Sequence, residues 1–288
     1  MKKILITGAA GYLGSHLAEK LINNKYEVIL IDKNSNRKSI LGVKILKLDL
    51  LYLKNQNNLF KNISHIFHFA GIADIKEANN NPQLTIDNNI KVTASLIKKA
   101  IDYKISRFFF ASTLYVYSKK GGIYKITKKT CEDLIIDSAE KYNLNYTILK
   151  FGSIYGGRAN NFNLIKNLIS FGLNGKKVDE KLTGNEIRSY IHIDDVSNIC
   201  IQLMRNLYIN KHILISGYKK ITIKTLVNNI NKILKTKINI KFVKKNDDDH
   251  YTSNVFDIKP NNLIRVKDYS YIPLDDGLKL TIENYKKS

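Results

Sequence analysis

Two tyrosine–lysine pairs lie close together in the stretch "FASTLYVYSKKGGIYKITKK", residues 110–129, and either could perform acid–base chemistry. Tyr115 is followed four residues later by Lys119, and Tyr124 is followed four residues later by Lys128. A free tyrosine has a pKa near ~10, and an adjacent ammonium group favours the phenolate, which can then remove a proton from a hydroxyl. This chemistry requires both side chains on one face of an element.

The local sequence pattern distinguishes the two pairs. Tyr124 and Lys128 fall in a helical pattern, "YKITKKTCEDLIIDSAEKY", in which residues four apart are neighbours. Tyr115 and Lys119 instead straddle the end of an apolar strand and the polar stretch before the glycines at 121–122, so nothing places them on one face. We predict that Tyr124 is the general base, and that Tyr115 lines the site or packs at the strand end.

A glycine-rich turn predicts a bound dinucleotide. The segment "ITGAAGYLGSHL" places Gly8, Gly11 and Gly14 directly after the first apolar run and at the start of a helical pattern. In such a turn the first glycine allows a tight bend, the second lets backbone N–H groups approach a pyrophosphate, and the third lets helix and strand pack closely. The spacing is Gly-x-x-Gly-x-x-Gly. Its strand–turn–helix context makes dinucleotide binding the favoured interpretation.

Two acids follow neighbouring strands and predict how the adenosine half is bound. Asp32 ends the second apolar run, where its carboxylate can accept hydrogen bonds from ribose hydroxyls and repel a 2′-phosphate, so it favours NAD over NADP. Lys33 and Arg37 would favour NADP if they faced that phosphate, but in a chain this rich in lysine we interpret them as surface charges. Asp49 either reaches the adenine or is an ordinary strand-end residue.

The elements that must position these residues alternate between strands and helices. Alternation of short apolar runs with helical patterns is typical of a doubly wound parallel sheet, so the predicted fold class is α/β of the Rossmann type. The six predicted strands are "KILITG", "EVILID", "KILKLDL", "HIFHFAG", "RFFFAST" and "NYTILKFG". We predict an NAD-binding domain over residues 1–152, to which 186–216 also contribute. Residues 153–185 and 217–288 should form a smaller substrate-binding region.

Composition limits the remaining classes of function. The chain has 288 residues, of which 44% are hydrophobic, and no apolar run approaches the ~18–20 residues of a membrane span, so we expect a cytoplasmic protein. Cys131 and Cys200 match no disulfide or zinc spacing, and no metal site is predicted. The net charge of +22 is spread over the whole chain, which makes nucleic acid an unlikely partner and suits an anionic small substrate.

Taken together, the motifs resemble those of the extended short-chain dehydrogenase/reductases, in particular the NAD-dependent nucleotide-sugar epimerases and dehydratases of the UDP-glucose 4-epimerase type. The similarity extends over nearly the whole chain, in order and spacing. It includes "TGAAGYLGSHL", the acid after the second strand, "DL" at 49–50, "HFAG" at 68–71, "NNIKVT", "ASTLYVY", "YKITKKTCE", "GSIYGGR", "EIRSYIHIDDV" and "IPLDDGLKLTIENY".

The resemblance implies roles for individual residues. It implies the catalytic set Thr113, Tyr124 and Lys128. It implies that Arg188 binds the diphosphate of a nucleotide-sugar substrate, and that the protein is a homodimer through helices near 88–103 and 124–141. The cofactor contacts that it implies, beyond Gly8, Gly11, Gly14, Asp32 and Asp49, are Tyr12, Leu13, Leu50, Phe69, Ala70, Gly71, Asn89, Tyr124 and Lys128. The further substrate-side candidates are Thr113, Tyr115, Arg158 and Tyr251.

Departures from the family pattern narrow the expected reaction. Similar dehydratases carry Asp-Glu directly after the catalytic Thr, and similar decarboxylases carry a Glu two residues after it; here these places hold Leu114 and Tyr115. The connection from Thr113 to Tyr124 is also shorter than is usual, and Lys150 and Gly157 replace a common arginine and proline. Redox chemistry at one carbon is therefore favoured, and we predict a nucleotide-sugar 4-epimerase. The alternatives are a 4-dehydrogenase or 4-ketoreductase, and a non-catalytic NAD- or RNA-binding member of the fold.

Overall fold

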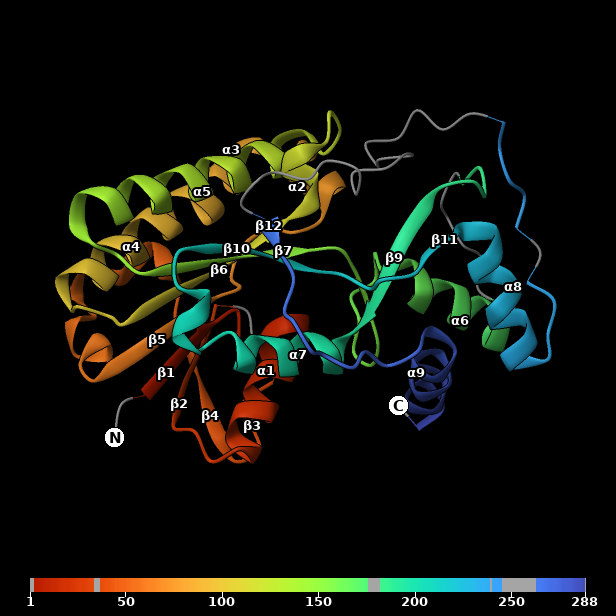
Figure 1. Cartoon of the computed structure of the whole chain (residues 1–288), viewed down its shortest axis with the longest axis horizontal. Helices are drawn as coiled ribbons and strands as arrows, with labels where there is room; N and C mark the ends of the chain where they lie inside the picture. Colours follow the sequence, from red (N-terminus) through yellow and green to blue (C-terminus); the bar gives the residue numbers. More distant parts are fainter. Residues whose placement is uncertain (1–2, 34–36, 176–181, 239, 245–262, 288) are drawn as a thin grey trace.

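The structure is a computed structural model of the chain, and it describes residues 3–33, 37–175, 182–238, 240–244 and 263–287. These residues form a large sheet of nine strands and a smaller sheet of three (Figure 1). In spatial order the large sheet contains β12 (Leu263–Ile264), β10 (Lys211–Ile215), β7 (Tyr146–Phe151), β6 (Arg107–Thr113), β5 (Ile63–His68), β1 (Lys3–Thr7), β2 (Val28–Asp32), β4 (Val43–Lys47) and β3 (Ser39–Ile40).

Strand order in the large sheet places the cofactor site. All neighbouring strands run parallel except the short hairpin of β3 and β4. The chain first moves from β1 to β2 and β4, and then returns to the other side of β1 with β5, β6 and β7. Ligands of doubly wound sheets bind beyond the carboxyl ends of the strands at such a reversal. The predicted α/β fold class is confirmed.

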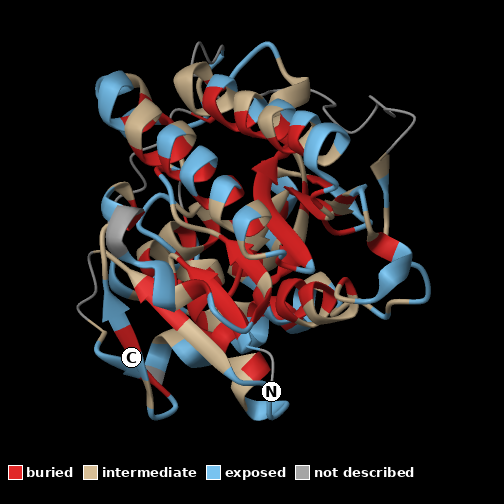
Figure 2. Ribbon diagram, turned by 90° about the vertical axis from the view of Figure 1, so that its left-hand side faces the viewer, coloured by how far each residue is buried: buried red, intermediate tan, exposed pale blue. Residues whose placement is uncertain are grey.

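Two hydrophobic cores lie on opposite faces of the large sheet. Side chains of β1 alternate between them, with Ile4 and Ile6 in one core and Leu5 in the other. The first core is covered by α1 (Tyr12–Asn23) and α7 (Ile193–Gln202), and the second by α4 (Val92–Asp102) and α5 (Gly122–Tyr142) (Figure 1). Figure 2 shows the buried strands between these layers. Burial on both faces explains why the strands read as continuous apolar runs.

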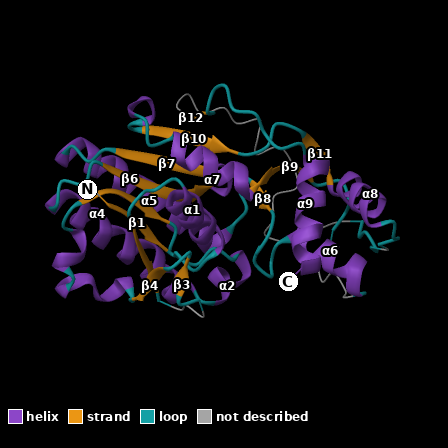
Figure 3. Cartoon of the chain, turned by 90° about the horizontal axis from the view of Figure 1, so that it is seen from below, coloured by secondary structure: helices purple, strands orange, loops and turns teal. Residues whose placement is uncertain are grey.

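The smaller sheet and its helices form a separate region beside the large sheet, as Figure 3 shows. Its strands are β8 (Ser153–Tyr155), β9 (Ile187–His192) and β11 (Lys220–Thr222), and its helices are α6 (Leu164–Asn174), α8 (Ile223–Leu234) and α9 (Leu274–Lys287). They share a third hydrophobic core. Between the segments of this region the chain returns to the large sheet as α7 and β10, and β12 joins the edge of the large sheet.

Cys131 and Cys200 are both buried free thiols, and they belong to the two different cores of the large sheet. Among the helices of the described residues, none is long and apolar enough to cross a bilayer.

Candidate active site

A cleft of about 1260 Å³ runs from the carboxyl ends of the large sheet to the smaller region. Its lining includes the glycine turn, the ends of β2, β5 and β6, the first turns of α5, and parts of β8, β9 and the loop before α6. The cleft therefore brings together residues from both regions of the chain. Most of the residues predicted for cofactor and catalysis contribute to this one surface.

The glycine turn has the shape that a dinucleotide requires. Gly8 has a positive φ of 69°, and an added Cβ there would lie 2.7 Å from the backbone nitrogen of Ala70. An added Cβ at Gly14 would lie 2.2 Å from the carbonyl oxygen of Gly8, so the helix packs directly on the turn. Gly11 is the N-cap of α1, and it supplies no side-chain hydrogen bond to the first N–H groups of that helix. These groups and the helix dipole are suited to a pyrophosphate.

The acids predicted for the adenosine half both line the cleft. Asp32 accepts a hydrogen bond of 3.0 Å from the backbone N–H of Ala10, which ties its carboxylate to the glycine turn. Asp49 caps a 3₁₀ helix, residues Leu50–Asn55, by accepting a hydrogen bond of 3.0 Å from the N–H of Leu51. Its position next to Leu48 and Leu50 in the lining is compatible with a contact to adenine. The residues present thus fit an NAD molecule.

The two nearby cations have protein partners. Lys33 lines the cleft, but its ammonium donates a hydrogen bond of 2.5 Å to Asn88. Arg37 lies 3.6 Å from the carboxylate of Glu19. Both cations therefore have a partner within the protein, and their interpretation as surface charges stays a prediction.

We expect Asp32→Ala to weaken NAD binding by about 10- to 100-fold, the value of one or two hydrogen bonds to a charged group. The preference for NAD over NADP should narrow as well, because the substitution removes the charge that repels a 2′-phosphate. Titration of both dinucleotides against wild type and variant measures this, with Lys33→Ala as the control. If the wild type preferred NADP, Lys33 and Arg37 would have to be reassigned as phosphate ligands.

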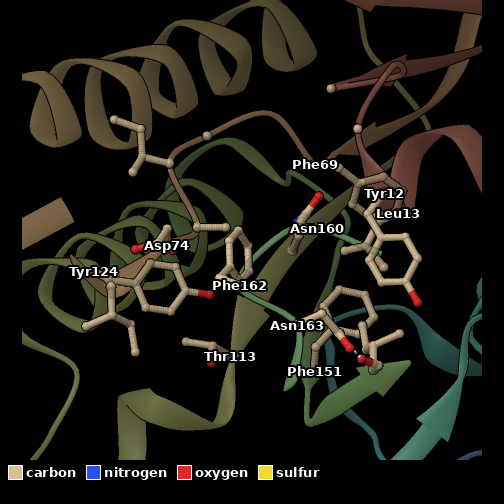
Figure 4. Close-up of a pocket in the computed structure, with 18 of the residues that line it drawn as sticks. Tyr12, Leu13, Phe69, Asp74, Thr113, Tyr124, Phe151, Asn160, Phe162 and Asn163 are labelled. Atoms are coloured by element: carbon tan, nitrogen blue, oxygen red, sulfur yellow. Dashed lines mark hydrogen bonds between the residues drawn. The ribbon is translucent and has the colours of Figure 1, made fainter. Parts of the chain in front are cut away.

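The predicted catalytic residues meet on one wall of the cleft. Thr113 is the last residue of β6, and Tyr124 and Lys128 lie on the first two turns of α5. Figure 4 shows the Tyr124 hydroxyl directed into the pocket, near Thr113 and Phe162. The Lys128 ammonium is buried and donates a hydrogen bond of 2.8 Å to the carbonyl of Ala111.

The pKa of Tyr124 differs from the value expected for a phenol beside an ammonium group. Burial raises the pKa of Tyr124 to about 12, whereas its hydrogen bond with Thr113 lowers it. The Lys128 ammonium is held at Ala111 instead, and burial lowers the pKa of Lys128. In the protein by itself, burial therefore raises the pKa of Tyr124, although the sequence predicted that the neighbouring ammonium would lower it.

Two glycines and an asparagine determine where α5 begins. Gly121 is its N-cap, with a left-handed φ of 103°, and Gly122 follows with a φ of 46°. The side-chain oxygen of Asn79, on α2 (Ile75–Asn80), accepts a hydrogen bond of 3.1 Å from the N–H of Ile123. This turn directs Tyr124 toward the cleft immediately after the chain leaves the sheet.

Tyr115 lines the same wall, whereas Lys119 is exposed and is not part of the lining. The rings of Tyr115 and Tyr124 pack edge to face, with centroids 6.2 Å apart. The backbone N–H of Tyr115 donates a hydrogen bond of 3.2 Å to the Thr113 hydroxyl. Tyr115 is thus a neighbour of the proposed base.

Asn89 lies behind the cleft. It belongs to a π-helical turn, residues Asp87–Lys91, and is buried. Its side chain accepts a hydrogen bond of 2.8 Å from the N–H of Ile72 and donates one of 3.1 Å to the hydroxyl of Thr127. Asn89 therefore connects the segment after β5 to α5, and it is not part of the cleft lining, so its predicted contact with the cofactor stays a prediction.

The smaller region contributes the opposite wall. Arg188 on β9 lines the cleft, as predicted for a ligand of the diphosphate. Arg158 is not brought to the lining: it has a positive φ of 59°, and its guanidinium pairs with both carboxylate oxygens of Glu19 at 2.7 and 2.8 Å. Tyr251 lies outside the described residues.

Sequence reasoning did not single out the loop before α6, which enters the cleft with Asn160, Phe162 and Asn163 (Figure 4). The side chain of Asn163 caps α6 by accepting a hydrogen bond from Lys166 and donates another of 2.8 Å to the carbonyl of Ile154. Phe162 remains half exposed within the cleft. The Asn-rich stretch "NNFN" was the only sequence signal, and it indicated irregular structure rather than a binding surface.

The chain belongs to the NAD-dependent epimerase/dehydratase family, whose model matches residues 4–216. An uncharacterized UDP-glucose epimerase, YtcB, of Bacillus subtilis is 29% identical over 271 residues, which are 84% of this chain and 85% of the relative. UDP-glucuronic acid decarboxylase 6 of Arabidopsis thaliana is 26% identical over 273 residues, 86% of this chain and 78% of the relative. The crystal structure of UDP-glucose 4-epimerase from Thermotoga maritima superposes with a TM-score of 0.85 at 24% identity and covers 99% of each chain.

These comparisons establish an NAD-dependent enzyme of the epimerase/dehydratase family with the extended short-chain dehydrogenase/reductase fold. The resemblance seen in the sequence motifs is confirmed. The names of the relatives include epimerases, dehydratases and decarboxylases, so the family alone does not choose among these reactions.

Proposed function

We propose that this protein is an NAD-dependent nucleotide-sugar 4-epimerase, similar to UDP-glucose 4-epimerases. One observation carries the choice of reaction: the two positions directly after Thr113, where similar dehydratases and decarboxylases carry acids, hold no carboxylate. Leu114 is buried at 2% exposure, and Tyr115 presents a phenol ring. Neither group can remove or return protons at the neighbouring carbons near neutral pH. The loss of acids at these two positions favours a 4-keto sugar that is reduced again or released.

The residues of the wall would act as follows. Tyr124 removes the proton of the sugar hydroxyl at carbon 4 and later returns it, while Thr113 holds the same hydroxyl by a hydrogen bond. The Lys128 ammonium favours the phenolate electrostatically. NAD, when bound, supplies the acceptor for the hydride and gives it back. Arg188 would hold the diphosphate by paired hydrogen bonds. The 4-keto sugar could then turn and present either face to the cofactor without leaving the cleft.

Proton NMR of a nucleotide-hexose incubated with catalytic amounts of protein tests this proposal. We expect inversion at carbon 4, with no net NADH and no added reductant. Asp74 also lines the cleft, although its carboxylate caps α2 by accepting a hydrogen bond of 2.9 Å from Glu77. If a 4-keto-6-deoxy sugar or a pentose formed, an acid such as Asp74 would have to act as a proton donor, and the epimerase assignment would be wrong.

The alternatives give different products in the same experiment. Stoichiometric accumulation of NADH would identify a nucleotide-sugar 4-dehydrogenase, and net consumption of NADH would identify a 4-ketoreductase. A non-catalytic NAD- or RNA-binding protein would give no product at all. The grouping of Thr113, Tyr124 and Lys128 at one wall argues against it, because binding alone needs no tyrosine–lysine pair.

We also infer that the protein is a homodimer through α4 and α5. A groove of about 340 Å³ lies between these helices, with apolar and charged lining. Lys98 and Asp102 both line it and pair with each other at 3.2 Å, so a second copy related by a two-fold axis could cover the apolar lining without leaving either charge unpaired. The remaining lining residues are Ala94, Ile97, Ile101, Leu134, Ser138 and Tyr142.

Ala94→Arg should convert the dimer to a folded monomer, because it introduces a charge into the groove at an exposed position. Ser95→Arg is the matched control, since Ser95 is the exposed neighbour outside the groove. Sedimentation velocity of both variants measures the outcome. A wild type that is already monomeric at micromolar concentration would contradict the inference.

A further inference from the structure

A buried ion pair lies directly beneath the catalytic wall. Glu132 of α5 is 2% exposed and Lys150 of β7 is 0% exposed. The Lys150 ammonium donates hydrogen bonds to both carboxylate oxygens of Glu132, and the Ser112 hydroxyl donates to one of them. Neither charged residue is part of the cleft lining.

The pair joins the two elements that carry the catalytic residues, β6 and α5, to the neighbouring strand β7. Ser112 immediately precedes Thr113 on β6, and it is the cross-strand partner of Lys150 on β7. Glu132 follows Lys128 by four residues, so it occupies the same side of α5 one turn further on. One carboxylate therefore connects the end of β6, the end of β7 and the catalytic turns of α5.

Stability alone does not explain a fully buried charge pair at this position. Removing two charges from water is costly, and apolar residues of similar volume at such sites are often equally stable or more stable. The same arrangement does fix a geometry, because a carboxylate that accepts hydrogen bonds from two elements allows little sliding of α5 along the sheet.

The charges around the pair are unbalanced. Lys128 and Lys150 are two buried cations near the buried anion Glu132; burial lowers the pKa of Lys128, and the charge of Glu132 opposes this effect. The Lys150 ammonium also lies 4.7 Å from the ring centroid of Tyr117, in the 3₁₀ turn after β6. The other titratable groups that interact with these residues include Lys129, Cys131 and Asp133 on α5, His68 on β5 and His212 on β10.

We propose that Glu132 and Lys150 are positioning residues for the reaction, which fix the distance of Tyr124 and Lys128 from Thr113 and set the charge beneath them. The proposal rests on the proposed function, because it concerns proton transfer by Tyr124. It assigns a role to Lys150, the residue that stands where similar proteins commonly have arginine.

The two single neutral variants should move the pH dependence in opposite directions. Glu132→Gln removes the anion and leaves two cations, which favours the Tyr124 phenolate and moves the pH profile of kcat/KM to lower pH. Lys150→Met leaves the anion without its partner and moves the profile to higher pH. The double variant Glu132→Gln/Lys150→Met should return close to the wild-type profile. Lys150→Arg keeps the charge and the pairing, and it should retain most of the activity.

The kinetic constants should separate positioning from binding. We expect kcat to fall by about 10- to 100-fold in each single neutral variant, since a displacement of about 1 Å can cost that much. KM and NAD affinity should change little, because neither residue lines the cleft. Ser112 does line the cleft. Ser112→Ala removes its hydrogen bond to Glu132 without changing charge, so it should lower kcat with no shift of the pH profile.

A readout that needs no substrate keeps the test independent of the proposed reaction. The ultraviolet difference spectrum between each protein and its Tyr124→Phe derivative reports phenolate formation in the NAD-bound state. In these spectra the pH at which the phenolate forms should move in opposite directions for the two single neutral variants, even if no nucleotide sugar is turned over. The pair would be merely structural if the activity of the variants fell only in proportion to their unfolded fraction and the phenolate titration did not shift. A shift in the same direction for both single variants would also overturn the proposal.

Discussion

Tyr124→Phe is expected to lower kcat by at least the ~10²–10⁴-fold that a positioned general acid–base group contributes. The substitution removes only the hydroxyl that faces the cleft near Thr113, so the packing of α5 and the affinity for NAD should remain close to wild type. Steady-state epimerisation rates and a separate NAD titration measure the two quantities.

Tyr115→Phe is the matched control, because both tyrosines line the same wall and their rings are in contact. It should cost far less, since Tyr115 has no cation four residues further on that reaches the cleft; Lys119 is exposed. Equal losses in two well-folded variants would mean that the phenol of Tyr115 takes part in proton transfer.

Arg188→Ala is expected to raise KM for the nucleotide sugar by about 30-fold or more, since truncating one partner of a hydrogen-bonded charge pair costs about 2 kcal/mol or more. Arg188→Lys should recover only part of this loss, because an ammonium cannot form the paired hydrogen bonds of a guanidinium. Initial rates over a range of substrate concentrations give KM and kcat separately.

Arg158→Ala is the control for this prediction. Its guanidinium pairs with Glu19 and lies outside the cleft lining, so its removal should leave KM nearly unchanged. A large increase in KM for Arg158→Ala would instead restore Arg158 as a substrate ligand and would require the pair with Glu19 to open on binding.

Features set by local sequence were predictable. The glycine turn is determined by its backbone: Gly8 adopts a positive φ and Gly14 packs against the carbonyl of Gly8. Tyr124 and Lys128 follow from helical spacing, and the parallel sheet from apolar runs that are buried on both faces. Each of these signals lies within a few residues of sequence.

Features that depend on distant partners were not predictable. Arg158 meets Glu19, which is 139 residues away, and nothing in "GSIYGGR" indicates that pairing. Glu132 and Lys150 each lie in an ordinary amphipathic or apolar pattern, and only the fold brings their charges together. Phe162 enters the cleft because Asn163 caps α6, and a cap in an Asn-rich loop does not reveal which surface its neighbour faces.

The central position of β1 has a consequence for the order of folding. Its two neighbours, β2 and β5, are synthesised at very different times. Only one helix separates β1 from β2, whereas the contact of Thr7 on β1 with His68 on β5 joins residues that are 61 positions apart. The Gly8 turn rests on Ala70, so a nascent chain that ends before β5 lacks one wall of its pyrophosphate turn. Such non-local pairing is slow, because loop-closure entropy is lost before the contacts form. The glycine turn would thus be able to bind its ligand only after β5, which is synthesised later, has formed.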